Sequence, residues 1–146
     1  MYKKILVALE NGPADESLLP HITELAKKFG SELLLVHVAD GWAARCFDQL
    51  TLAESEEMKS DRAYLESAAS QLRQAGIMAT TLLALGSPPE EIRKAAEAEH
   101  CDLIAMGSHG HRLIGDILHG STITEVRHHT LIPVLLVRAQ KKPGPT

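Results

Sequence analysis

KILVAL, residues 4–9, is the first apolar run of the chain and decides its class of fold. A strand buried on both faces of a parallel sheet is apolar at every position, whereas a strand with one face in water alternates apolar and polar residues. The next segment, Asp15 to Phe29, changes to helical spacing of its apolar residues, and Gly30 ends it. A buried strand followed at once by an amphipathic helix is typical of a parallel α/β sheet.

The alternation of strands and helices continues along the rest of the sequence. Apolar runs predict four more strands, over Glu32–Val38, Met78–Leu85, Asp102–Met106 and Val134–Arg138. Helical periodicity predicts three more helices, over Glu54–Ala75, Ser87–Glu99 and Ser121–His129. The sequence therefore predicts one Rossmann-like α/β domain over residues 1–146, an open five-stranded parallel sheet with helices on both faces, and residues 139–146 as a flexible tail.

Two local signals refine the helix boundaries. Pro20 lies inside the first helical pattern, so we expect either a later start of that helix or a kink in it. The stretch Ser87–Glu90 combines the residues of a capping box with proline at the first helical position, so we expect a helix to begin there with a side-chain cap.

Composition excludes several classes of protein. The 146 residues, 45% hydrophobic and 23% charged, suit one globular domain and not a disordered or fibrous chain. A net charge of −4, with one Trp, two Tyr and two Phe, argues against nucleic acid as a partner. The first apolar run is too short for a signal peptide or a membrane span, so we expect a cytoplasmic protein without membrane contact. Cys46 and Cys101 are too few for a disulfide framework, and we expect both to be inert, Cys101 as a buried small hydrophobe.

Ligands of open parallel sheets bind beyond the carboxyl ends of the strands, here the loops after Leu9, Val38, Leu85 and Met106. The last of these loops begins the stretch GSHGHRLIGDILHGST, residues 107–122, with glycines directly after a buried strand. Glycine lets a ligand approach the backbone closely. The stretch ends in a Gly-Ser-Thr helix start, where free N–H groups and hydroxyls favour an anion.

Each feature of this loop also has a purely structural reading, because glycines make turns and Ser or Thr caps helices. The spacing Gly-x₂-Gly-x₉-Gly-Ser favours a binding site, since it places both features at one end of the sheet. It is neither a P-loop, which needs Gly-Lys-Ser/Thr, nor a Rossmann fingerprint, which should follow the first strand. The first strand is followed instead by ENGP, residues 10–13.

The sequence resembles the universal stress proteins over nearly its whole length. The segments that carry the resemblance are KILVAL (4–9), LVHV (35–38), DLIAMGSHG (102–110) and IPVLLVR (132–138). The Gly-x₂-Gly-x₉-Gly-Ser spacing is similar to the motif of the family's ATP-binding branch, which a second, non-binding branch lacks. The resemblance implies ATP, or ADP or AMP, as ligand, with Mg²⁺ held mainly by the phosphates.

The resemblance also implies roles for individual residues, none of them catalytic. The ribose and first phosphates would be lined by Gly107, His109 and Gly110. The outer phosphates would be held by Gly120, Ser121 and Thr122, with His111 and Arg112 as further phosphate contacts. The adenine would lie near Val38 and Met106, with backbone contacts from Ala8 and Leu9.

Glu10 departs from the family pattern, in which an aspartate commonly ends the first strand and contacts the nucleoside or metal region. The longer side chain would either still reach the ribose or crowd it and weaken binding. A carboxylate solvated in a loop is the alternative interpretation of this residue.

The sequence gives less support to a metal site or to a catalytic function. Neither His109 with His111 nor His128 with His129 has the helical spacing of a metal site. We expect His37, inside a predicted strand, to be a hydrogen-bonded core histidine. An ATPase would need a positioned base and a charge clamp, for which Arg112 and His119 are the nearby candidates. Charged residues of the long helix are expected on its solvated face: Glu56, Glu57, Lys59, Asp61 and Arg62.

The leading hypothesis is an ATP-binding module whose bound nucleotide changes a surface read by a protein partner. The predicted last strand, Pro133 to Arg138, should lie at a sheet edge, and the resemblance implies a homodimer formed through it. Two alternatives stay open: an interaction protein whose pocket no longer binds nucleotide because of Glu10, and a slow ATP hydrolase.

Overall fold

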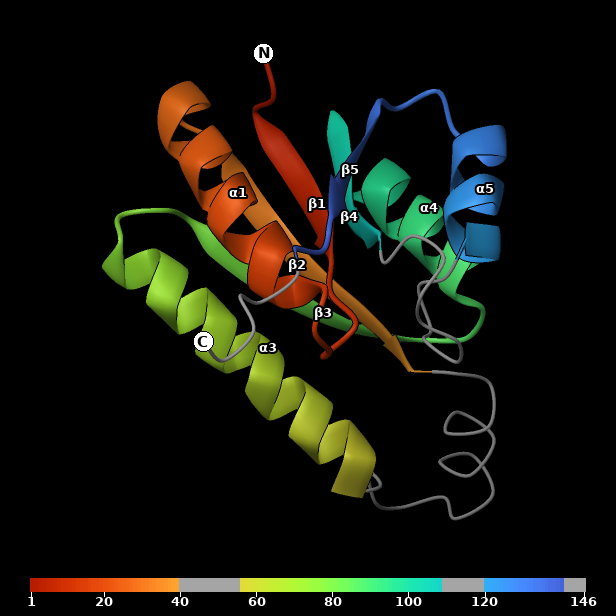
Figure 1. The fold of residues 1–146 in the computed structure, drawn as a ribbon, viewed down its shortest axis with the longest axis horizontal. Coiled ribbons are helices and arrows are strands. Elements are labelled where there is room, and N and C mark those ends of the chain that lie inside the picture. The colour runs from red at the N-terminus through yellow and green to blue at the C-terminus, as the bar shows by residue number, and fades with distance from the viewer. Residues whose placement is uncertain (40–55, 109–119, 141–146) are drawn as a thin grey trace, which may run out of the picture.

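The computed structural model describes residues 1–39, 56–108 and 120–140, coloured along the chain in Figure 1. Strands and helices alternate throughout these residues, as the sequence predicts. The strands are β1 (Lys4–Ala8), β2 (Glu32–Ala39), β3 (Ala79–Leu85), β4 (Leu103–Ser108) and β5 (Val134–Arg138). The helices are α1 (Asp15–Phe29), α3 (Glu56–Gln74), α4 (Pro88–Ala98) and α5 (Gly120–His129).

All strand pairs are parallel, and the sheet order is β3-β2-β1-β4-β5. The predicted open five-stranded α/β sheet is therefore confirmed. The chain first winds outward from β1 to β3 and then crosses back to β4, so the winding reverses between β1 and β4. This reversal makes the carboxyl ends of β1 and β4 the expected ligand crevice.

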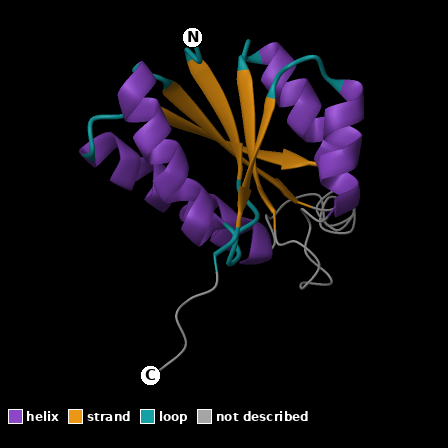
Figure 2. Ribbon diagram, turned by 45° about the horizontal axis from the view of Figure 1, so that its top comes forward, coloured by secondary structure: helices purple, strands orange, loops and turns teal. Residues whose placement is uncertain are grey.

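The sheet separates two hydrophobic cores. Helices α1 and α3 cover one face, and α4 and α5 cover the other, which Figures 1 and 2 show from two directions. Successive side chains of a strand point to opposite faces, so Val7 and Leu9 join the first core while Leu6 and Ala8 join the second. Both faces of β1 are buried, which explains its uninterrupted apolar sequence.

The helix boundaries agree with the sequence signals at some points and correct them at others. Helix α1 spans Asp15–Phe29 with Pro20 inside it, so the expected later start is wrong. Gly30 ends this helix in the left-handed conformation, with φ 65°. Ser87 is the N-cap of α4, but its side chain makes no capping hydrogen bond. Pro89, at the second helical position, has no backbone N–H for such a cap to accept, which leaves only the N–H of Glu90 as a partner.

The two residues after β5 form hydrogen bonds with other parts of the domain. The N–H of Ala139 donates to the carbonyl of Ser108 at 2.8 Å, and the N–H of Gln140 donates to Oγ of Ser17 at 2.9 Å. The start of the predicted flexible tail is thus attached to β4 and α1, and residues 141–146 lie outside the described part of the chain. No helix in the described ranges has the length and apolar character needed to cross a membrane.

Candidate functional site

Three apolar side chains meet on one face of the sheet at its carboxyl edge. Ala8 ends β1, Met106 is its register partner on β4, and Val38 is the penultimate residue of β2. All three belong to the core beneath α4 and α5, and none is more than 4% exposed. The structure therefore brings together the side chains that the sequence analysis assigned to the surroundings of an adenine.

The first turn of α5 lies over the same core. Thr122 is 4% exposed, and Ile123 packs in the cluster that contains Met106 and Val38, whereas Ser121 is exposed. Helix α5 follows β4 in the chain, and its amino end faces the carboxyl edge of the sheet (Figure 1). The first N–H groups of an α-helix lack intrahelical acceptors and carry the positive end of the helix dipole. At this edge, buried apolar side chains therefore lie beside a helix end that favours negative charge.

The backbone N–H and carbonyl of Leu9 both have hydrogen-bond partners within the protein. Its N–H donates to the carbonyl of Val36 at 2.8 Å, and its carbonyl lies 2.9 Å from Nδ1 of His37. A backbone N–H has a single hydrogen to donate. The ligand contact predicted for Leu9 can therefore come only from the second lone pair of its carbonyl.

Gly107 lies against the start of α1. A β-carbon placed on Gly107 would be 2.9 Å from Cβ of Ala14, closer than such atoms approach in proteins. The sequence analysis assigned this missing side chain to the approach of a ligand. The structure shows that Ala14 occupies the space, so packing against α1 already requires glycine at this position.

Glu10 is buried at the point where the winding reverses. The residue is 9% exposed, and its Oε1 would lie 3.2 Å from a β-carbon on Gly12, so the side chain lies against the next turn of the loop. The interpretation of Glu10 as a solvated loop carboxylate is therefore wrong. Its carboxylate is held inside the candidate site, on the loop between β1 and α1.

Asp15 fixes the conformation of this loop. Its two carboxylate oxygens accept hydrogen bonds from the N–H of Glu10 at 3.2 Å, the N–H of Asn11 at 2.9 Å and the hydroxyl of Tyr64 at 2.6 Å. Burial raises the pKa of Asp15 above its ordinary value, and the bond from Tyr64 and the backbone bonds oppose that rise. Burial and the bond to Asp15 also raise the pKa of the Tyr64 hydroxyl, so it stays a donor. Asp15 thus ties α1 and α3 to the end of β1.

His37 and Asp61 form a second buried connection between β2 and α3. Nε2 of His37 lies 3.2 Å from Oδ2 of Asp61, and Oδ1 of Asp61 accepts a hydrogen bond from the side-chain amide of Asn11 at 3.0 Å. His37 is 3% exposed, which confirms the prediction of a hydrogen-bonded core histidine. Asp61 is 7% exposed, so its expected place on the solvated face of α3 is wrong.

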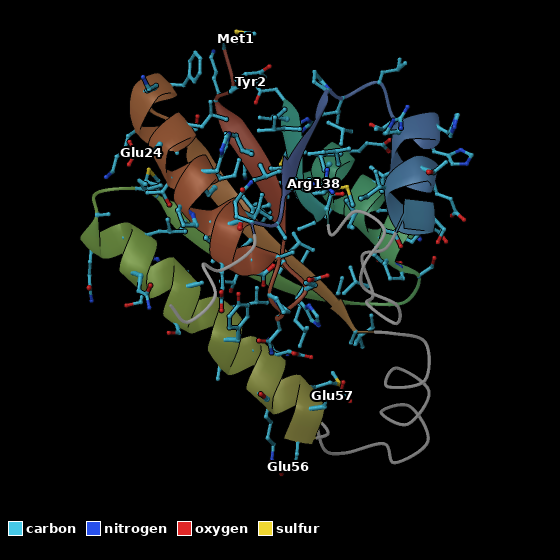
Figure 3. All side chains as sticks on the ribbon, in the orientation of Figure 1. Met1, Tyr2, Glu24, Glu56, Glu57 and Arg138 are labelled. Carbon is cyan, nitrogen blue, oxygen red and sulfur yellow. The ribbon has the colours of Figure 1, made fainter. Side chains whose placement is uncertain are left out.

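Sequence reasoning missed Asp61, Asp15 and Tyr64 as members of the site. The sequence spacing could have identified Asp61 as buried, because it lies three residues after Met58 and four before Leu65, on the apolar face of α3. A carboxylate at such a position must find a partner in the core. The other charged residues predicted to be solvated are exposed, and Figure 3 shows Glu56 and Glu57 at the outer end of the helix.

Part of the predicted site falls outside the described residues. The phosphate contacts His109, Gly110, His111 and Arg112 lie there, as do His119 and Cys46. Cys101 is buried before β4, as predicted, and burial raises its pKa to about 11. Among the residues that the structure describes, no three His, Cys, Asp or Glu side chains form a group that could hold a metal ion.

Comparison with known proteins gives a consistent family match. A model of the universal stress protein family matches residues 1–138. Universal stress protein MJ0577 of Methanocaldococcus jannaschii is 30% identical over 155 residues, covering 94% of this chain and 96% of that protein. Universal stress protein Sll1388 of Synechocystis sp. is 27% identical, covering 94% of this chain and 98% of the relative.

Solved structures show the same fold. The structure of MJ0577 matches with a TM-score of 0.81 at 28% identity, covering 97% of this chain and 99% of the other. A universal stress protein of Archaeoglobus fulgidus, solved in complex with dAMP, matches with a TM-score of 0.70 at 23% identity, covering 93% and 98%. A further universal stress protein, solved in complex with cAMP, matches with a TM-score of 0.68 at 18% identity, covering 95% of this chain and 98% of the other.

Proposed function

Because the chain belongs to the universal stress protein family, we propose that it binds an adenine nucleotide at the carboxyl edge of its sheet. ATP is the ligand that the Gly-x₂-Gly-x₉-Gly-Ser spacing favours, with ADP and AMP as the other members of the class. Two proteins of the same fold were solved with adenine nucleotides, dAMP and cAMP, which supports this class of ligand.

The observation that carries the proposal is the juxtaposition of two chemically different surfaces at one edge. Ala8, Val38 and Met106 form an apolar floor that suits a flat aromatic base. The amino end of α5, starting at Gly120, supplies N–H groups and the hydroxyls of Ser121 and Thr122 for phosphate oxygens. An adenine nucleotide has both an apolar base and a charged phosphate chain, so it fits both surfaces at once.

The buried carboxylate of Glu10 is compatible with this ligand. Glu10 lies on the β1–α1 loop beside the apolar floor, where it accepts hydrogen bonds from ribose hydroxyls or contributes to the surroundings of a phosphate-bound Mg²⁺. Magnesium keeps several waters and is held chiefly by the phosphates, so a single protein carboxylate suffices.

The bound nucleotide acts as a signal in this proposal. A nucleotide bound at the start of α5 changes the surface at this edge of the sheet, which a protein partner reads. The edge strand β5 pairs only with β4 in the described sheet and leaves Leu136 42% exposed. A homodimer formed through residues 133–138 covers this apolar edge.

Isothermal titration calorimetry with Mg-ATP tests the proposal on protein from which co-purified nucleotide has been removed and identified. The wild type is expected to bind ATP, and Gly120→Val to lose at least about tenfold in affinity, because a branched side chain at the helix start obstructs the phosphates. Glu125→Val, an exposed position further along α5, is the matched control and should bind as the wild type does.

Two outcomes separate the alternatives. A wild type that gives no heat at several temperatures and releases no nucleotide on denaturation overturns the proposal in favour of an interaction protein. Release of phosphate from bound ATP, slowed by Arg112→Ala, would instead identify a slow hydrolase.

A further inference from the structure

The ring of His37 lies between two hydrogen-bond acceptors. Nδ1 is 2.9 Å from the carbonyl oxygen of Leu9, and Nε2 is 3.2 Å from Oδ2 of Asp61. A carbonyl oxygen only accepts, and an ionised carboxylate only accepts. A neutral imidazole has one N–H and one bare nitrogen, so it can satisfy only one of these contacts.

The geometry therefore requires one proton more than neutral His37 and ionised Asp61 possess, carried by the ring or by the carboxyl group. With both ring nitrogens protonated, His37 donates to Leu9 and to Asp61, and the two side chains form a buried ion pair. A bare nitrogen facing the Leu9 carbonyl or an ionised Asp61 would place two lone pairs in contact inside a core where both side chains are less than a tenth exposed. The buried positive charge is balanced by the adjacent carboxylate.

The second oxygen of Asp61 connects this pair to the candidate site. It accepts a hydrogen bond from the amide of Asn11, whose backbone has φ 57°, in the left-handed region that non-glycine residues rarely adopt. Asn11 follows Glu10 directly, and Asp15 holds the N–H groups of both residues. The loop that carries Glu10 is therefore fixed at one end by the Leu9 carbonyl and at the other by the Asn11 side chain.

We propose that His37 and Asp61 are positioning residues of the nucleotide site, and that His37 does so as an imidazolium. This inference rests on the proposed function. The pair holds the Leu9 carbonyl and Asn11 in place, so the Glu10 carboxylate is presented in the conformation that the nucleotide meets. Loss of the proton from His37 as the pH rises breaks one of its two hydrogen bonds, loosens the loop and weakens nucleotide binding.

In the part of the chain that the structure describes, few other groups that titrate surround His37. On α3 it faces Asp61, and through Asn11 it is connected to Asp15 of α1 and Tyr64 of α3. The loop after β1 adds the carboxylate of Glu10. On the third side, the register partner on β3 is the apolar residue Leu83. Among the described residues, the titratable groups connected to His37 are thus acids or a phenol.

Nitrogen-detected NMR of the imidazole rings tests the protonation without any nucleotide. In the ligand-free wild type at neutral pH, His37 is expected to show two protonated ring nitrogens. In Asp61→Asn it is expected to become the neutral tautomer protonated at Nδ1, because the new amide donates to Nε2 while its oxygen still accepts from Asn11. A wild-type His37 with one bare nitrogen at neutral pH overturns the protonated pair.

ATP affinity measured between about pH 5 and about pH 9 tests the positioning role. The wild type is expected to lose several-fold in affinity as the pH rises, and Asp61→Asn to bind with little dependence on pH, because its network needs no extra proton. Asp61→Ala, which leaves the Asn11 amide and Nε2 of His37 without that partner, should bind more weakly at every pH. Glu57→Gln, exposed on the same helix, is the control and should follow the wild type.

The two measurements fail in distinguishable ways. Equal pH profiles for the wild type and Asp61→Asn overturn the positioning role, even if both bind ATP. A wild type that binds no adenine nucleotide at any pH overturns the proposed function and with it the positioning role, while the imidazole spectrum still decides the protonation state of His37.

Discussion

The α-carbon of Gly107 packs against the methyl group of Ala14, so the end of β4 and the start of α1 are in direct contact. A β-carbon on Gly107 would lie 2.9 Å from that methyl carbon. Gly107 stands next to the reversal of the winding, and Ala14 precedes the first turn of α1. The same contact therefore sets how closely the β1–α1 loop, which carries Glu10, approaches the end of β4.

Gly107→Ala is expected to destabilise the protein by about 1–3 kcal/mol, because the added methyl group overpacks a buried contact. Ala14→Gly removes the opposing methyl group at a helix N-cap, where glycine is tolerated. The double variant should recover a large part of the loss, as measured by urea denaturation. Additive losses in the double variant would contradict a direct contact between the two residues.

Asp15→Asn is expected to lower the free energy of unfolding by about 1–3 kcal/mol, because an amide cannot accept all the hydrogen bonds that Glu10, Asn11 and Tyr64 donate. Glu24→Gln removes an exposed carboxylate from the same helix and should change stability by less than about 0.5 kcal/mol. Denaturant unfolding of both variants beside the wild type provides the comparison. Equal effects of the two substitutions would contradict the role assigned to Asp15.

The contribution of Asp15 to the free energy of unfolding depends on pH with a definite sign. Burial raises the pKa of Asp15 in the folded protein above its ordinary value of 3.8, so folding favours the protonated acid. The resulting contribution to stability is complete below that ordinary value and is lost as the pH rises through the raised pKa. The stability of the wild type relative to Asp15→Asn should therefore fall as the pH rises from acid toward neutral. A relative stability that grows with pH would contradict the assignment.

Cys101 is expected to be inert toward thiol reagents in the folded protein. Burial raises its pKa to about 11, so at pH 8 only about one molecule in a thousand carries the reactive thiolate. Cys46→Ser leaves Cys101 as the only cysteine of the chain. Its reaction with a chromogenic disulfide should be at least about a hundredfold slower in buffer than in denaturant. Comparable rates in both conditions would show that Cys101 is accessible.

Leu136→Asp is expected to convert a dimer into a monomer, because it places a charge in the exposed apolar edge of β5. Light scattering at tens of micromolar, a working range for dimers of moderate affinity, provides the mass. Leu82→Asp changes a similarly exposed leucine on β3, the opposite edge strand, and should remain dimeric. A wild type with the mass of a monomer would contradict the dimer itself.

The sequence predicted the fold because each element has its own periodic pattern. The continuous apolar character of β1 reports burial on both faces, and Gly30 marks the end of α1 by its left-handed conformation. The alternation of such elements then allows few topologies. Individual side-chain contacts have no comparable pattern, and the capping bond predicted for Ser87 from its motif is wrong.

The candidate site was predicted only in part. The resemblance implied Ala8, Val38 and Met106 as members of the site, and the structure places their side chains in one cluster. The contact of Gly107 with Ala14 could not be predicted. A glycine in the sequence does not indicate whether a ligand or a neighbouring side chain occupies the space beside it. Asp61 was placed in solvent because charged residues surround it in sequence, although its spacing from Met58 and Leu65 puts it on the buried face.

Backbone amide NMR during a titration with Mg-ATP tests the central claim most directly. The stripped protein should show saturable changes at Gly107, Ser108 and the first residues of α5, with small changes at the opposite end of the sheet, around Gly30 and Gly76. Changes of this kind that are absent in Gly120→Val would place the phosphates at the start of α5. A titration that leaves the amides at the carboxyl edge unchanged, or that moves only those at the opposite end, would contradict the proposed nucleotide site.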